Sequence, residues 1–154
     1  MKVLYIGQYT NGTTSKMRAD TLRSILQSQI FKIIDTHVPF YNTHRLWRSF
    51  GFRYKRGLLI NNINKYIVAA LKEETYDLIW VDKAVFITPK TTALLRSRTK
   101  KLIHFTPDPA FTFHKSKLFL KSLSYYDFLV TTKSYELEHY HKFTKTEKVL
   151  YATQ

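Results

Sequence analysis

Short runs of apolar residues alternate along the chain with longer segments of helical period. Strands that alternate with helices are typical of a parallel sheet with crossover helices. Six runs predict strands: Lys2–Ile6, Phe31–Asp35, Asp77–Val81, Lys101–Phe105, Asp127–Thr131 and Lys148–Ala152. Runs this apolar at consecutive positions predict an α/β domain of three layers, in which helices cover both faces of the sheet. The predicted sheet core is Val3, Leu4, Ile6, Ile33, Ile34, Leu78, Ile79, Val81, Ile103, Phe105, Leu129 and Val130.

The helical segments differ in the strength of their pattern. The strongest spans Leu58–Glu73, where apolar residues recur on one helical face at Leu59, Ile63, Tyr66, Ile67 and Ala70. The first strand is followed by a predicted helix with Ser15 as its N-cap. Its apolar stripe is Met17, Leu22, Ile25 and Leu26. Further helices are predicted over Pro89–Arg98, Ser116–Ser124 and Ser134–Phe143.

Only one clear helix, Leu58–Glu73, separates the second strand from the third. The simplest path then returns over the first strand, which predicts the strand order 2-1-3-4-5-6. Ligands of such sheets bind at the carboxyl ends of the strands where the order reverses, here between the first and third strands. The loops at that edge are Gly7–Thr14, Asp82–Thr88 and Thr106–Phe113. Because no repeat or Gly/Ser linker interrupts the pattern, residues 1–154 are predicted to form one Rossmann-like domain.

The amino-acid composition indicates the cellular compartment of the protein and the kinds of partner that it could bind. The 154 residues carry a formal charge of +14, which favours anionic partners such as phosphates, nucleic acid or an anionic membrane face. The absence of cysteine excludes disulfides, thiol nucleophiles and thiolate metal sites. The apolar start Met1–Ile6 is too short for a signal peptide, and no run approaches the roughly 20 apolar residues of a membrane span. These features predict a cytoplasmic protein.

The loop from Gly7 to Ser15 follows a strand and opens a helix, where backbone N–H groups can hold an anion. It nearly matches the phosphate-binding motif G-x-x-x-x-G-K-[ST], but Thr13 stands where that motif needs lysine. It also lacks the G-x-G-x-x-G pattern of dinucleotide sites. A phospho-receiver domain is excluded because Gly7 and Gln8 replace the acids that its magnesium site needs. The loop is therefore either a site for an anion or substrate hydroxyl, or a polar turn that binds nothing.

The segment from Thr36 to Lys72 contains seven Lys or Arg residues and no Asp or Glu. Its densest part interleaves cations with rings: Arg45, Trp47, Arg48, Phe50, Phe52, Arg53, Lys55 and Arg56. This pattern suits the headgroup region of an anionic bilayer, where the protein would sit peripherally on the inner face of the membrane. It also suits single-stranded nucleic acid, although less well. The remaining alternative is a loop that packs its rings into its own domain while the charges stay solvated.

Two acids follow predicted strands at the ligand-binding edge. Asp108 lies between Pro107 and Pro109, which restrict the backbone around it, so its carboxylate is a candidate general base. Asp82 follows the third strand beside Lys83 and is a second candidate. Each acid could instead be a turn residue that caps the next segment. The histidines His37, His44, His114, His139 and His141 show no metal spacing except His139-x-His141, whose rings would diverge on a helix into solvent.

Several segments together resemble the N-terminal half of CgeB-like glycosyltransferases, which have the two-domain GT-B fold. The similarity extends over nearly the whole chain, although each motif is short. The segments are Gly12-Thr13-Thr14-Ser15 with Arg18 and Leu22, Asp77-Leu78-Ile79-Trp80-Val81-Asp82-Lys83, Thr106-Pro107-Asp108-Pro109, Ser124-Tyr125-Tyr126-Asp127 and Val149-Leu150-Tyr151.

The resemblance implies an acceptor-side domain that helps to move a sugar from a nucleotide-sugar donor to a hydroxyl. It assigns acceptor binding to Gly12, Thr13, Thr14, Ser15, Arg18 and Lys83, and proton transfer to Asp108 or Asp82. GT-B enzymes usually need no metal, so no cofactor is expected. A partner domain that binds the donor should follow Gln154, and residues 1–154 alone are expected to be inactive. The alternative is a non-catalytic Rossmann-like module that binds a polyanion.

Overall fold

A computed structural model of the chain describes residues 1–112 and 115–153. Its centre is a parallel sheet of six strands in the order β2-β1-β3-β4-β5-β6, which confirms the predicted α/β class and topology. The strand bounds are β1 Lys2–Gly7, β2 Ile30–Asp35, β3 Tyr76–Asp82, β4 Thr99–Thr106, β5 Phe128–Thr131 and β6 Val149–Tyr151. They differ from the predicted ranges by at most two residues at either end.

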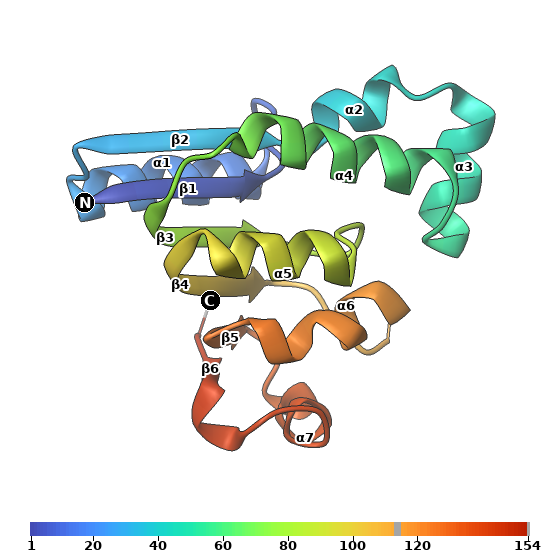
Figure 1. The fold of residues 1–154 in the computed structure, drawn as a ribbon. Coiled ribbons are helices and arrows are strands. Elements are labelled where there is room, and N and C mark those ends of the chain that lie inside the picture. Colours follow the sequence, from blue (N-terminus) through green and yellow to red (C-terminus); the bar gives the residue numbers. More distant parts are fainter. Residues whose placement is uncertain (113–114, 154) are drawn as a thin grey trace.

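The helices are unequally divided between the two faces of the sheet. Helices α4, α5 and α6 lie in front of the sheet in Figure 1, and α1 lies behind it. The bounds are α1 Thr14–Leu26, α2 His37–Asn42, α3 Arg45–Tyr54, α4 Leu58–Leu71, α5 Pro89–Ser97, α6 Lys117–Ser122 and α7 Leu137–His141. None of the helices in the described part of the chain is long and apolar enough to cross a membrane.

The hydrophobic core lies between the sheet and α4, α5 and α6. Of the predicted core, eight residues are buried: Val3, Leu4, Ile6, Ile34, Ile79, Val81, Phe105 and Leu129. The other four are half-buried, namely Ile33, Leu78, Ile103 and Val130. The strand register places these four on the face that carries α1. One helix covers less of a sheet than three do. The face that carries α1 is therefore less completely buried than the predicted three-layer arrangement implied.

Three helices join β2 to β3, where the sequence pattern predicted one. Helix α3 ends at Tyr54, and Lys55, which follows it, has a left-handed φ of 53°. Gly57 has a φ of 86° just before α4. These two positions turn the chain sharply, and α3 packs back on α4 through Gly51. A Cβ on Gly51 would come within 2.5 Å of the Cβ of Leu59, so only glycine allows this close approach. The strand order is unaffected, because all three helices belong to one crossover.

The predicted N-cap of α1 was wrong by two residues. Thr13 is the N-cap, and its hydroxyl accepts a hydrogen bond from the Lys16 backbone N–H at 3.3 Å. Ser15 lies inside the helix and is buried, and its hydroxyl lies within hydrogen-bond distance of the Tyr5 hydroxyl on β1. The last two predicted helices are also shorter than expected. A 3₁₀ turn over Leu123–Tyr125 follows α6, and another over Ser134–Glu136 precedes α7.

Candidate functional site

The candidate site lies where the strand order reverses. Strand β1 runs between β2 and β3, and the chain leaves β1 toward one face of the sheet and β3 toward the other. The loops therefore separate at the carboxyl ends of β1 and β3 and leave a crevice between them. In Figure 1 the arrowheads of β1 and β2 point toward this edge, and α2 and α3 lie beyond it.

A buried polar network forms the floor of this crevice. The Tyr5 hydroxyl donates to Asp82 Oδ2 at 2.5 Å and lies 2.9 Å from Ser15 Oγ, which can donate in return. Arg18 donates to the same carboxylate from Nε and Nη2 at 3.3 and 3.2 Å. The Asp82 side chain is completely buried, so its charge depends on these partners. Burial, and then the charge of Asp82, raise the pKa of Tyr5, which therefore stays a neutral donor.

Gly7 ends β1 directly against this network. A Cβ at Gly7 would lie 2.9 Å from Asp82 Cβ, 3.0 Å from a ring carbon of Tyr5 and 3.1 Å from Ser15 Oγ. These three close neighbours leave no room for a side chain at position 7, which explains why glycine stands there. Gly12 has a φ of 79°, and Thr13 caps the helix, so these two residues shape the turn at the exposed rim.

Next to the network is a cleft of about 160 Å³. It is smaller than the roughly 300–1,000 Å³ of typical small-molecule sites, so it can hold only one end of a larger ligand. Four of the predicted site residues line it: Ser15, Asp82 and Lys83, and Phe52 from the basic segment. The full lining is Gln8, Ser15, Thr36, His37, Phe52, Asp82, Lys83, Val85 and Phe86.

His37 is the residue of this cleft that the sequence analysis missed. Its backbone N–H donates to Asp35 Oδ1 at 2.9 Å, which fixes the start of α2. The ring nitrogen Nδ1 is buried and has no hydrogen-bond partner in the described part of the chain. Burial lowers the pKa of His37, and the nearby Lys83 lowers it further against the opposing effect of Asp35. His37 is therefore neutral at pH 7 and able to accept a proton. Its place two residues after a predicted strand was the available signal for this site.

Lys83 lines the cleft and is paired with Asp108, which does not line it. Lys83 Nζ lies 2.7 Å from Asp108 Oδ2, so the ion pair joins the loops that follow β3 and β4. The Lys83 backbone is left-handed, with a φ of 56°, and its N–H donates to the Phe105 carbonyl at 3.0 Å. A left-handed lysine is strained, and such strain persists where the surrounding structure holds it, commonly at functional sites.

Glu136 holds the Asp108 loop from the other side. It is fully buried and accepts hydrogen bonds from the backbone N–H groups of Ala110 and Phe111 at 2.8 and 2.9 Å. No sequence signal pointed to this contact, because Glu136 is distant in the chain and lies in a short helical turn. The loop is thus fixed by Glu136 as well as by its two prolines. Phe113, the last residue predicted for this loop, lies outside the described residues.

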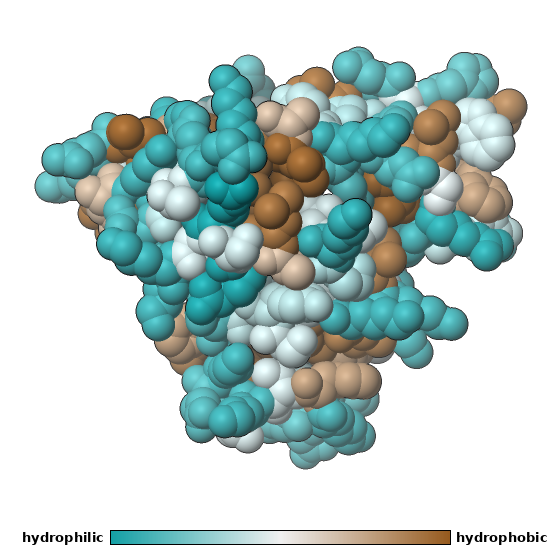
Figure 2. Space-filling model, viewed as in Figure 1, coloured by the Kyte–Doolittle hydropathy of each residue, from teal (hydrophilic) through white to brown (hydrophobic). Residues whose placement is uncertain are grey.

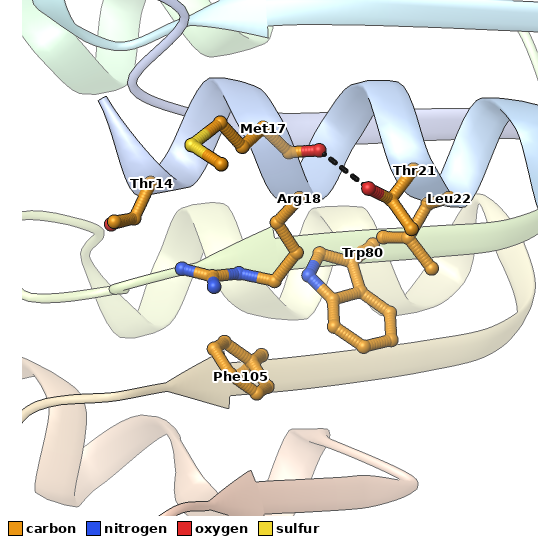
Figure 3. Close-up of a pocket in the computed structure, with 7 residues that line it drawn as sticks. All are labelled: Thr14, Met17, Arg18, Thr21, Leu22, Trp80 and Phe105. Atoms are coloured by element: carbon orange, nitrogen blue, oxygen red, sulfur yellow. Dashed lines mark hydrogen bonds between the residues drawn. The ribbon is translucent and has the colours of Figure 1, made fainter. Parts of the chain in front are cut away.

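A second hollow lies on the other side of Arg18. It has a volume of about 350 Å³ and is bounded by α1, β3 and β4. In Figure 3 the Arg18 side chain extends from α1 over the ring of Phe105, and its guanidinium carbon lies 4.2 Å from the ring centre. Trp80 stacks on the same ring at 5.7 Å. Thr14, a predicted acceptor residue, lines this hollow instead of the cleft.

The basic segment is helical, which corrects the packed-loop interpretation. Phe52 lines the cleft, where its ring lies 5.8 Å from that of Phe86. Lys55 lies over both rings, and burial lowers its pKa. Trp47 and Arg45 are exposed on the outer side of α3. The segment therefore contributes one ring to the cleft wall and leaves others in solvent.

In residues 1–112 and 115–153 no group of three or more metal-binding side chains was found, and His114 falls outside these ranges. His139 and His141 are both exposed, as their spacing predicted.

Neither a scan against protein-family models nor a search of curated proteins found a match to this chain. The candidate site therefore has to be interpreted from its own geometry.

Proposed function

We propose that the chain is the acceptor-side domain of a glycosyltransferase, and that the cleft beside His37 receives the acceptor hydroxyl. The observation that carries the proposal is the half-buried His37 ring in a small cleft at the switch point of the sheet, with an Nδ1 that has no hydrogen-bond partner among the described residues. Glycosyl transfer forms a bond between the acceptor oxygen and the anomeric carbon while the bond to the departing diphosphate breaks. The acceptor proton must pass to a base, and His37 is suited to take it.

The other polar groups have distinct roles in this proposal. Asp108 is half-buried and is held by Lys83, so it can accept a hydrogen bond from the acceptor or share the proton. Asp82 is completely buried and engaged by Arg18 and Tyr5, which favours a positioning role over proton transfer. The donor nucleotide would bind to a second domain, as the family resemblance implies. Residues 1–154 alone should therefore fold without turning over sugar nucleotides.

The test is a chemical-shift titration of the isotope-labelled chain with simple glycosides, nucleotide sugars and inorganic diphosphate. We expect glycosides to shift the resonances of cleft residues such as Gln8 and Thr36. Nucleotide sugars should bind no more tightly than diphosphate does. The His37→Gln variant should weaken the glycoside response, and His139→Gln, which changes an exposed histidine, should leave it unchanged.

Two results would contradict the proposal. Micromolar binding or turnover of one nucleotide sugar would place the donor site on this chain. Titration of all glycosides without any shift in the cleft would exclude acceptor binding. A second candidate function is the binding of an anionic surface. It is favoured by the cations of α3, for which no ion pair is found among the described residues, and it is compatible with transfer in the cleft.

A further inference from the structure

The outer surface of α3 combines exposed apolar and cationic side chains that the cleft does not explain. Leu46 is 72% exposed and Trp47 is 51% exposed, although both are large and apolar. Figure 2 shows hydrophobic atoms interspersed with hydrophilic ones over this α2–α3 region, at the upper right. We define the α3 surface as Val38, Tyr41, Arg45, Leu46, Trp47, Arg53, Tyr54, Arg56 and Leu58, all of which are exposed.

The positive charge of this surface is not neutralised within the molecule. The segment from Thr36 to Lys72 has no acid, and the eight ion pairs found among residues 1–112 and 115–153 all lie outside it. Several cations of this segment instead contact rings. Arg53 and Arg56 lie over the Tyr54 ring at 5.8 and 5.6 Å. The guanidinium groups therefore keep their full charge available for an external anion.

We propose that the α3 surface docks on a bilayer that contains anionic phospholipid. An interfacial helix buries its apolar residues at the boundary between headgroups and acyl chains, while its Lys and Arg residues pair with lipid phosphates. Leu46 and Trp47 supply the inserting residues; Arg45 precedes them in the sequence, and Arg53 and Arg56 follow them. Each cation near an anionic surface strengthens binding, so the interaction is weakened by salt.

The aliphatic residues favour a membrane over nucleic acid. Proteins that bind single strands stack bases on rings along a charged groove. Here Leu46, Val38 and Leu58 are exposed among the rings, and aliphatic side chains gain little from stacked bases. Helix α3 also lies at the outside of the molecule, beyond the carboxyl edge of the sheet, where it can meet a flat surface (Figure 1).

Docking through α3 would place the cleft beside the headgroups. Phe52 in the cleft wall and Trp47 on the docking surface are five residues apart on one helix, a rise of about 7.5 Å. An acceptor hydroxyl carried by a membrane molecule could therefore reach His37. This consequence rests on the proposed function, whereas the docking itself does not.

The two tryptophans allow a direct test, because one lies on the α3 surface and the other on the sheet. The Trp80→Phe variant leaves Trp47 as the only tryptophan. Its fluorescence should shift to the blue with vesicles of phosphatidylcholine and phosphatidylglycerol, and brominated acyl chains should quench it. The Trp47→Phe variant leaves Trp80, whose emission should not change. Vesicles of phosphatidylcholine alone should have no effect on either variant.

Charge is tested by two variants that each lose three cations. Arg45→Gln, Arg53→Gln and Arg56→Gln together should weaken partition to anionic vesicles by about a hundredfold, because each cation contributes about fivefold at the surface. The matched control changes Lys121, Lys142 and Lys145, which are exposed on α6 and after α7, to Gln. It should weaken partition by less than tenfold.

Several results would overturn the docking proposal. They are equal partition to neutral and anionic vesicles, no partition to either, or equal losses in the two charge variants. Quenching of Trp47 by single-stranded DNA together with no response to vesicles would replace the membrane with nucleic acid. The glycoside titration is carried out without vesicles, so the proposed function can fail while the docking proposal stands, or the reverse.

Discussion

The Asp82 carboxylate is a buried charge with no exposure to solvent. Its carboxylate is held by Arg18 and by the Tyr5 hydroxyl, and its side chain is fully buried. A buried charge that keeps its partners is tolerated, whereas a buried charge that loses one is strongly destabilising. This difference decides what a single substitution does at the floor of the cleft.

Replacing Arg18 should reveal this dependence. We expect Arg18→Met to lower the free energy of unfolding by about 3–5 kcal/mol, because Asp82 is left without a cation. Arg23→Met removes an exposed arginine from the same helix and should change stability by less than about 1 kcal/mol. Urea denaturation followed by circular dichroism measures both. If the stability losses of Arg18→Met and Asp82→Asn simply add in the double variant, the two residues are not a mutually dependent pair.

His104 should make stability depend on pH. Burial lowers its pKa to about 3, whereas the unfolded chain titrates near 6.5. Between these values only the unfolded chain binds the proton, so stability is complete above pH 6.5 and falls as the pH decreases. The loss between pH 6.5 and 5 is about 2 kcal/mol, at about 1.4 kcal/mol per pH unit.

The His104→Gln variant should remove this contribution, while its amide oxygen can still accept the Ala84 N–H that His104 Nε2 now accepts. Urea midpoints at pH 7.5 and 5 measure the difference. The wild type should lose more stability on acidification than the variant does. Some dependence should remain in the variant, because burial also lowers the pKa of His37. Parallel losses in the two proteins would show that His104 does not titrate as a buried group.

At the scale of elements, the position of α3 depends on one missing side chain. Gly51 allows α3 to approach α4 at Leu59, and α3 in turn carries both Phe52 and Trp47. The same helix thus links the cleft wall to the proposed docking surface. Its attachment is through a short contact and not through a large buried face, since Gly51 is the only fully buried residue described within α3.

Gly51→Ala tests this attachment. In an isolated helix the change would be stabilising by up to about 1 kcal/mol. Here the new methyl group collides with Leu59, so we expect a destabilisation of about 1–3 kcal/mol and faster hydrogen exchange in α3. Ser49→Ala, at an exposed position of the same helix, should be neutral or slightly stabilising. A stabilising effect of Gly51→Ala would show that the helices can separate without loss.

At the scale of the whole molecule, the sheet has one well covered face and one thinly covered face. Helices α4, α5 and α6 bury the first, and α1 lies on the second (Figure 1). Parallel sheets normally have both faces covered. The thin cover explains why Ile103 is only half-buried although it lies on a central strand.

A pair of matched substitutions measures this asymmetry. Ile79 on β3 is fully buried beneath the front helices, and Ile103 on the adjacent β4 faces the other side. We expect Ile79→Ala to lower the free energy of unfolding by about 2–5 kcal/mol. Ile103→Ala should lower it by about half as much, because less apolar surface leaves water there on folding. Equal losses in chemical denaturation would indicate that the second face is covered in solution.

The sequence by itself determined the α/β class, the six strands and their order, because apolar runs, helical period and short crossovers are local signals. It also located Lys83, Asp82 and Asp108 at the carboxyl edge of the sheet, since each follows a predicted strand. Only the tertiary structure decided which of these groups is buried, paired or open. The Tyr5–Asp82–Arg18 network, the unpartnered nitrogen of His37 and the clamp by Glu136 join residues that are distant in the chain. Such contacts depend on how the elements pack, which no local pattern encodes.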